Sequence, residues 1–267
     1  MRGQRNLRLT KLLTQMLLHP NVTQHLIDFA VDFDVSKTII SDDVVAIDTS
    51  LRELGLGYVL VDKGRNGGAR FVPFLSKENR EQFLSDLAKE LGKSKRILPG
   101  GLIYYSDLIF QPDIAQKLAF CLASLYDDVK IDTVLTSEVK GIPVALYLAQ
   151  ALNAKLAVCR FRNRASDGAA MAVHYPTSNG DVRTMYMGTQ QMQKGTKVLI
   201  MDDFLRGGST ITGMALMAEQ FKAKVVGVAT IIANKKPKLK IDKRYSSLLT
   251  FSTDEYGITK LSVTHND

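Results

Sequence analysis

Apolar residues in the first quarter of the chain recur at steps of three and four, the spacing of amphipathic helices. The three series cover residues 7–17, 26–33 and 40–54. The first series stops before Pro20, where proline prevents continuation of a helix, and the third follows Ser36, a favourable N-cap residue. Two short β-type runs, at residues 58–61 and 69–72, then flank a glycine-rich turn. The pattern therefore predicts three helices followed by a hairpin.

Three helices and a hairpin, in this order, are the organisation of a winged-helix domain, which we assign to residues 1–74. Residues 76–95 are charged and helical in pattern, which suits a connecting or dimer-forming helix. Beyond it, strand-like and helix-like segments alternate, so residues 75–267 are predicted to form an α/β domain with a mainly parallel sheet. The expected elements are helices at 114–127, 143–152 and 210–221, and strands at 133–136, 155–160, 198–201 and 225–232.

Composition narrows the choice of partner and compartment. The formal net charge of +8 fits a polyanionic partner, and residues 1–11 hold four bases and no acid. Cys121 and Cys159 sit in apolar stretches without metal-like spacing, so we expect reduced, buried thiols and no metal site. No apolar run approaches the roughly 18 residues of a membrane span. We therefore expect a cytoplasmic protein that does not enter a membrane.

The sharpest motif is residues 198–210, in which an apolar strand leads into two carboxylates, a small-residue turn and an amphipathic helix. Its polar and glycine positions are Asp202, Asp203, Gly207, Gly208, Ser209 and Thr210. Ligands of open α/β sheets bind at the carboxyl ends of strands, where the two aspartates can accept hydrogen bonds from ribose hydroxyls. The glycines permit a tight loop at a helix N-terminus, which suits a phosphate group.

This segment resembles the phosphoribosyl pyrophosphate-binding motif of type I phosphoribosyltransferases. That resemblance implies that Lys140 and Gly141, in the loop after the preceding strand, hold the diphosphate. Together with the predicted winged helix, these motifs resemble the purine operon repressor family of Gram-positive bacteria along essentially the whole chain. The resemblance implies that Phe204 and Arg206 line the effector pocket, and that residues 160–175 correspond to the flexible catalytic loop of the enzymes.

The same resemblance implies a homodimeric regulator that senses phosphoribosyl pyrophosphate and has no catalytic residues and no required cofactor. It leaves Mg²⁺ beside the effector, and a guanine nucleotide in the same pocket, as open alternatives. Two positions depart from the family pattern. Leu102 stands where the family commonly has an aromatic residue, which puts base stacking there in doubt, and Ser209 replaces a second glycine.

Candidate contacts to double-stranded DNA lie in the predicted winged helix. Short polar side chains at the start of a helix suit phosphate and base-edge contacts in a major groove, and basic residues on a hairpin or arm suit the backbone. The candidates are Ser36, Lys37, Thr38 and Ser41 on the third helix, Lys63 and Arg65 on the hairpin, and Arg2 and Arg5 at the N-terminus. Asp42, Asp43 and Asp48 would repel phosphate unless they face away, so a winged helix for protein contacts remains an alternative.

Two other functions remain open at this point. The chain could be an active purine phosphoribosyltransferase with an added domain, which turnover with a purine base would show. It could also be an RNA-binding attenuator, but a winged helix is shaped for the major groove of B-form DNA, which A-form RNA does not offer. The operator sequence, and whether binding represses or activates, are not encoded in any motif of the chain.

Overall fold

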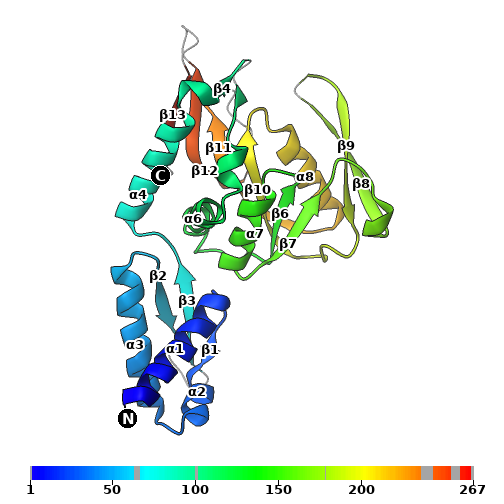
Figure 1. Cartoon of the computed structure of the whole chain (residues 1–267). Coiled ribbons are helices and arrows are strands. Elements are labelled where there is room, and N and C mark those ends of the chain that lie inside the picture. The colour runs from blue at the N-terminus through cyan, green and yellow to red at the C-terminus, as the bar shows by residue number, and fades with distance from the viewer. Residues whose placement is uncertain are drawn as a thin grey trace.

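The chain forms two units, a small N-terminal unit beside one end of a larger α/β unit (Figure 1). The computed structural model describes residues 2–62, 67–99, 102–177, 179–235, 243–253 and 259–265, with residues 2 and 3 as backbone only. The fold class predicted from the sequence is confirmed, since a helical unit with a small sheet precedes a mainly parallel sheet with helices.

The N-terminal unit follows the predicted order of three helices and a hairpin. Its elements are α1 (Arg2–Leu18), β1 (Gln24–His25), α2 (Leu26–Asp32), α3 (Lys37–Glu53), β2 (Gly57–Val61) and β3 (Gly68–Pro73). The first helix ends before Pro20, and the Ser36 side chain caps α3 by accepting a hydrogen bond from the Ile39 amide at 3.3 Å. The two-residue strand β1 pairs with β3 and was not predicted. The apolar faces of the three helices and the hairpin share one core.

Helix α4 (Lys77–Leu91) joins the two units and packs along the edge of the larger sheet. At its start, the Asn79 side chain donates a hydrogen bond of 3.2 Å to the carbonyl of Leu54, directly after α3. Elsewhere, the Asn21 side chain donates to the carbonyl of Ala151 at 2.7 Å. A cavity of about 660 Å³ lies between the units, lined in part by Tyr58 and other residues of both. Hydrogen bonds at Asn79 and Asn21 therefore connect the two units.

The larger unit is built on a six-stranded sheet with the order β13-β12-β11-β10-β6-β7. All neighbouring pairs are parallel except β12 with β13, at the edge. The sheet strands are β6 (Thr133–Ser137), β7 (Lys155–Cys159), β10 (Lys197–Leu205), β11 (Lys224–Asn234), β12 (Tyr245–Thr253) and β13 (Thr259–Val263). The flanking helices are α5 (Ser106–Ile109), α6 (Pro112–Ala123), α7 (Ile142–Ala151) and α8 (Ser209–Gln220).

Each face of this sheet has its own apolar core. Helices α4, α6 and α7 contribute to one, whereas α8 and the hairpin of β8 (Ala170–Pro176) and β9 (Val182–Gly188) contribute to the other. The hairpin stands beside α8 (Figure 1). There the two elements approach closely, because a Cβ added to Gly213 of α8 would lie 2.8 Å from the Tyr175 ring. Both cysteines are buried and unpaired, as expected.

Several element boundaries differ from those predicted. Strand β10 continues through Leu205, because it pairs with β11 as far as Ala233, so the two aspartates lie on the strand itself. Helix α6 ends at Ala123 and not at residue 127. The strands β8, β9, β12 and β13 were not predicted. Among the described residues, no helix combines the length and apolarity that crossing a membrane requires.

Candidate phosphate-binding site and nucleic-acid interface

The two aspartates lie at the carboxyl end of the central strand β10. Asp202 is buried and Asp203 is half-buried, and the Asp203 amide donates to Asp202 Oδ1 at 3.1 Å. Burial, followed by the nearby charge of Asp203, raises the pKa of Asp202 well above that of an ordinary aspartate. The pair therefore places a cluster of hydrogen-bond acceptors at the end of the strand.

A glycine with a left-handed backbone conformation, Gly208, lies between this strand and α8. Gly208 has φ +80° and precedes the first helical residue, Ser209. A residue with a side chain is strained at that φ, so glycine suits the position. Gly208 offers no side chain to cap the helix, and Ser209 and Thr210 are half-buried in the first turn. Backbone N–H groups at such a helix start favour an anionic group.

The loop after β6 lies next to the aspartates of β10. It contains a cis peptide bond between Glu138 and Val139, and then Lys140 and Gly141, which directly precedes α7. A Cβ added to Gly141 would lie 3.8 Å from the Asp203 amide nitrogen, so the two predicted loops are neighbours in space. The structure thus brings the glycine and lysine of this loop beside the aspartates at the end of β10.

Tyr105, which was not among the predicted site residues, completes this cluster. Its hydroxyl donates a hydrogen bond to Asp203 Oδ2, and Lys140 Nζ lies 4.6 Å from the centre of its ring. Phe204 packs edge-on against the same ring, with centroids 6.2 Å apart, and against Phe251 at 5.7 Å. Phe204 therefore forms a fixed wall next to the aspartates. Arg206 is exposed in the turn that follows.

A buried arginine positions the segment that carries Tyr105. This segment, called the hood here, comprises residues 97–99 and 102–109, with the short strands β4 (Ile97–Leu98) and β5 (Leu102–Ile103) and helix α5. Arg96 donates two hydrogen bonds to Asp107, at 2.8 and 2.9 Å, and one of 3.1 Å to Glu90 of α4. The guanidinium lowers the pKa of Asp107, so this carboxyl is ionised near neutral pH. The hood is thereby fastened to α4.

The N-terminus of α3 forms the candidate nucleic-acid interface. Ser36, Lys37 and Thr38 are exposed there, whereas Ser41 is half-buried and its hydroxyl donates to the Lys37 carbonyl at 3.0 Å. Arg5 is also exposed and lies 3.5 Å from Asp43. Ser36, Lys37 and Thr38 are therefore free to approach a groove, and Arg5 is connected to the same helix by its ion pair with Asp43.

Two of the three aspartates that would repel phosphate face inward. Asp43 is buried between α3 and α1, where Arg8 binds it by an ion pair. Asp48 accepts hydrogen bonds from the Val59 amide at 2.6 Å and from Arg52 at 2.8 Å. Asp42 remains exposed. The main electrostatic objection to DNA binding by α3 is thus reduced to one residue.

Three predicted DNA contacts cannot be placed. Lys63 and Arg65, and the side chain of Arg2, lie outside the described residues. The segment expected to match the flexible catalytic loop, residues 160–175, holds a turn at Ala165–Asp167 and most of β8. Within the part of the chain that the structure describes, no group of three metal-ligating side chains is found.

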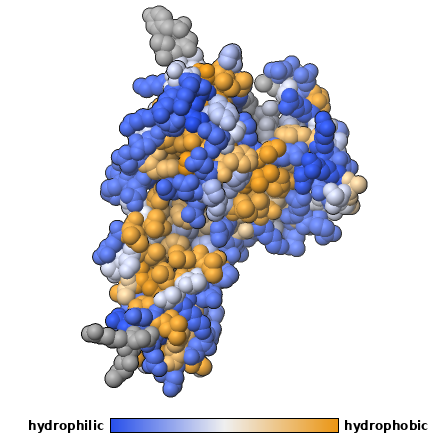
Figure 2. All heavy atoms as spheres, viewed as in Figure 1, coloured by the Kyte–Doolittle hydropathy of each residue, from blue (hydrophilic) through white to orange (hydrophobic). Residues whose placement is uncertain are grey.

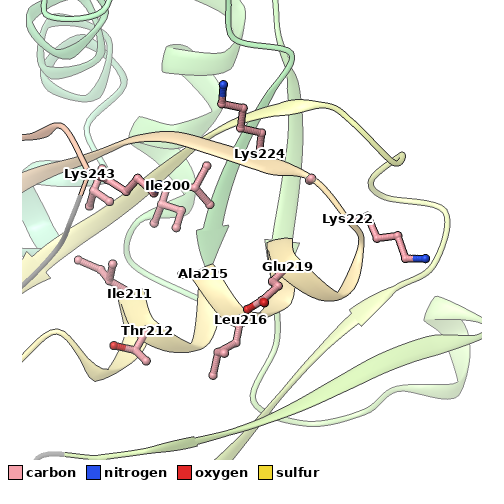
Figure 3. Close-up of a pocket in the computed structure, with 12 residues that line it drawn as sticks. Ile200, Ile211, Thr212, Ala215, Leu216, Glu219, Lys222, Lys224 and Lys243 are labelled. Atoms are coloured by element: carbon pink, nitrogen blue, oxygen red, sulfur yellow. The ribbon is translucent and has the colours of Figure 1, made fainter.

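A second cavity, of about 660 Å³, lies along α8 (Figure 3). Apolar residues such as Ile211 and Leu216 line it, with Glu219 and three lysines at its rim, and none of the predicted site residues takes part. The Lys222 amino group points away from the apolar lining (Figure 3). We assign no ligand to this cavity.

Comparison with known families matches both units. A family described as "Bacterial purine repressor, N-terminal" matches residues 4–73, and one described as "Phosphoribosyl transferase domain" matches residues 105–264. The purine biosynthesis transcriptional repressor PurR of Bacillus subtilis is 32% identical over 254 residues, which are 95% of this chain and 89% of that protein. The purine biosynthesis transcriptional activator PurR of Lactococcus lactis is 32% identical over 97% of this chain and 96% of its own length.

Enzymes are similar to the larger unit alone. A xanthine phosphoribosyltransferase of Lactococcus lactis is 32% identical over 41% of this chain and 57% of its own length. The crystal structure of adenine phosphoribosyltransferase from Thermoanaerobacter pseudethanolicus superposes with a TM-score of 0.55 and 18% identity, covering 63% of this chain and 99% of that one. This likeness supports the phosphoribosyltransferase fold of the larger unit.

Proposed function

Because the chain belongs to the family of bacterial purine repressors that carry a phosphoribosyl transferase domain, we propose that it regulates transcription of purine synthesis and salvage genes by binding DNA. Its larger unit would sense phosphoribosyl pyrophosphate without transferring the phosphoribosyl group. The observation that carries this proposal is the convergence of Asp202 and Asp203 with the Gly208 turn and with Lys140. These groups offer acceptors for ribose hydroxyls and donors for phosphates at adjacent positions.

Each part of phosphoribosyl pyrophosphate has a matching feature. The 5′-phosphate suits the N-terminus of α8, where Ser209 and Thr210 add hydroxyls to the backbone N–H groups. The ribose hydroxyls suit the aspartates, and the diphosphate suits Lys140 and Gly141. Mg²⁺ beside the diphosphate, and a guanine nucleotide in the same place, remain alternatives that binding experiments can separate.

The DNA part of the proposal rests on α3. Its exposed residues Ser36, Lys37 and Thr38 stand at a helix N-terminus, and the buried ion pair of Arg8 with Asp43 removes a negative charge from this surface. Helix N-termini and short polar side chains are common partners of phosphates and base edges. The unit would read double-stranded DNA in the control regions of purine genes.

The test is DNA retardation with purine promoter fragments, with and without phosphoribosyl pyrophosphate. Hydrogen bonds to charged groups are worth roughly 1.5–3 kcal/mol each, so replacing Asp202 and Asp203 by Ala should weaken effector binding at least about a hundredfold. This variant should bind DNA like the wild type but no longer respond to the effector. Asp113→Ala, which changes an exposed aspartate of the same unit, is the control and should respond normally. A retained response in the double variant would contradict the assignment of the site.

An active purine phosphoribosyltransferase remains the second candidate, favoured by the similarity to xanthine phosphoribosyltransferase over 112 residues. Incubation with phosphoribosyl pyrophosphate and adenine, guanine, hypoxanthine or xanthine distinguishes the two. Release of pyrophosphate that depends on the base, and that is lost in the Asp202/Asp203 variant, would establish the enzyme.

We also propose that the protein acts as a homodimer. Apolar residues gather on the visible surface over α7 and over the end of the N-terminal unit nearest to the larger unit (Figure 2). Val139 and Leu146, in the loop before α7 and in α7, are 61% and 55% exposed. Exposed apolar patches of this kind commonly mark protein contacts. Sedimentation should give twice the chain mass for the wild type and a shift to monomer for Leu146→Glu; a monomeric wild type would contradict the proposal.

A further inference from the structure

The hydroxyl of Tyr105 already binds one oxygen of the carboxylate to which the ribose of the proposed effector would bind. It donates a hydrogen bond to Asp203 Oδ2, although the two residues are 98 positions apart in the sequence. On the other aspartate, Asp202 Oδ1 accepts from the Asp203 amide, and the side chain is buried. In this structure, the more accessible carboxylate therefore already has a hydroxyl partner of the chain's own.

The tyrosine is held in this place from several sides. Its side chain is 4% exposed and packs between Lys140 and Phe204. Its backbone precedes α5, whose Asp107 is fastened by both terminal nitrogens of Arg96. Burial, with the charge of Asp203, raises the pKa of Tyr105, so the phenol is a hydrogen-bond donor throughout the neutral range. A ribose hydroxyl would offer the carboxylate the same kind of bond.

We propose that the Tyr105 hydroxyl is an internal competitor for the ribose-binding carboxylate, and that an effector binds Asp203 only by displacing it. Tyr105 would then lower the affinity of the site and set a requirement on the ligand, which must present a hydroxyl group able to replace the phenol. Ligands that fill only the phosphate positions meet no such competition. This inference rests on the proposed function, because it assumes that ribose hydroxyls bind the aspartates.

Tyr105→Phe removes the hydroxyl and keeps the ring that Lys140 and Phe204 contact. Because the free state then loses a hydrogen bond to a charged group, the affinity for phosphoribosyl pyrophosphate should rise about tenfold, measured by calorimetry in buffer with MgCl₂. Tyr104→Phe is the matched control, since this neighbour is 49% exposed, and its affinity should equal that of the wild type. Inorganic pyrophosphate should bind all three proteins equally.

Displacement of the phenol also has a direct optical signature. The chain contains no tryptophan, so tyrosine absorption is not masked. Phosphoribosyl pyrophosphate should produce a tyrosine ultraviolet difference spectrum in the wild type and in Tyr104→Phe, and a much smaller one in Tyr105→Phe. Pyrophosphate should produce little change in any of them. Thermal unfolding of each variant checks that the fold is retained.

Unchanged or weaker binding of phosphoribosyl pyrophosphate by Tyr105→Phe would overturn the proposal, because the phenol would then be neutral or would assist binding. An equal gain for pyrophosphate would also overturn it, since the effect would not lie at the ribose position. If the wild type itself bound no phosphoribosyl pyrophosphate, the proposed function would fail and this inference with it. Binding by the wild type together with unaltered affinity in Tyr105→Phe would refute only the role of the tyrosine.

Discussion

Gly141→Ala should impair effector binding through a single steric contact. A Cβ at this position would lie 2.6 Å from Thr136 Oγ1, whereas its next contacts, with Met201 Sδ at 3.7 Å and the Asp203 amide at 3.8 Å, are ordinary. Thr136 is fully buried on strand β6, where a β-branched side chain has little room to turn. Overpacking of this kind costs about 1–3 kcal/mol. If the loop moves to relieve it, effector affinity should fall about tenfold, since 1.4 kcal/mol is one factor of ten.

Changing the other partner isolates this contact. Thr136→Ala removes the clashing atom, and it breaks no hydrogen bond, because Thr136 Oγ1 has no hydrogen-bond partner among the described residues. Gly141→Ala combined with Thr136→Ala should therefore recover most of the effector affinity, as measured by calorimetry. Thr136→Val leaves a carbon atom in place of the oxygen, and it should not rescue Gly141→Ala. Equal affinities of the two double variants would refute the steric explanation.

Three further predictions concern charge. The folded chain raises the pKa of Asp202, so above the ordinary aspartate pKa it keeps a proton that the unfolded chain has released. The contribution of Asp202 to the free energy of unfolding therefore falls as the pH rises from that value towards neutrality. Asp202→Asn should consequently unfold at a higher temperature than the wild type at neutral pH, with a difference that shrinks in acid; a constant difference would contradict the raised pKa. Arg8→Met should lower the free energy of unfolding, measured with urea, by about 3–5 kcal/mol, because Asp43 stays buried with a weaker ion pair. Arg8→Met combined with Asp43→Leu should recover much of this loss. Replacing Lys63 and Arg65 by Ala should reduce the slope of log K for DNA binding against log salt concentration by about two units. An unchanged slope would show that the hairpin of the N-terminal unit makes no phosphate contacts.

The parts of the fold that follow from local patterns could be predicted from the sequence. Apolar periodicity gave α1, α3 and α8 to within a few residues, and the cap at Ser36 followed from the residue type alone. The glycine turn at Gly208 was also predictable, because its small residues directly follow a buried strand. In each case the signal lies within a dozen neighbouring positions.

Features that depend on distant partners could not be predicted. The extension of β10 through Leu205 requires pairing with β11. Strand β1 has only two residues and forms only because it pairs with β3. Tyr105 meets Asp203 across 98 positions, and Arg8 meets Asp43 across 35. No periodicity encodes such contacts, because they arise when separate elements pack together. By charge alone the aspartates of α3 disfavour DNA, and only their partners in the fold, Arg8 for Asp43 and the Val59 amide for Asp48, turn two of them inward.

The close approach of Gly213 to Tyr175 has an evolutionary consequence. The glycine leaves no room for a Cβ against the ring, so a mutation at either position alone would separate α8 from the β8–β9 hairpin or create a void. Substitutions at the two sites should then be inherited together. Lineages with a larger residue at position 213 should carry a smaller one at position 175, and large residues at both positions should be rare.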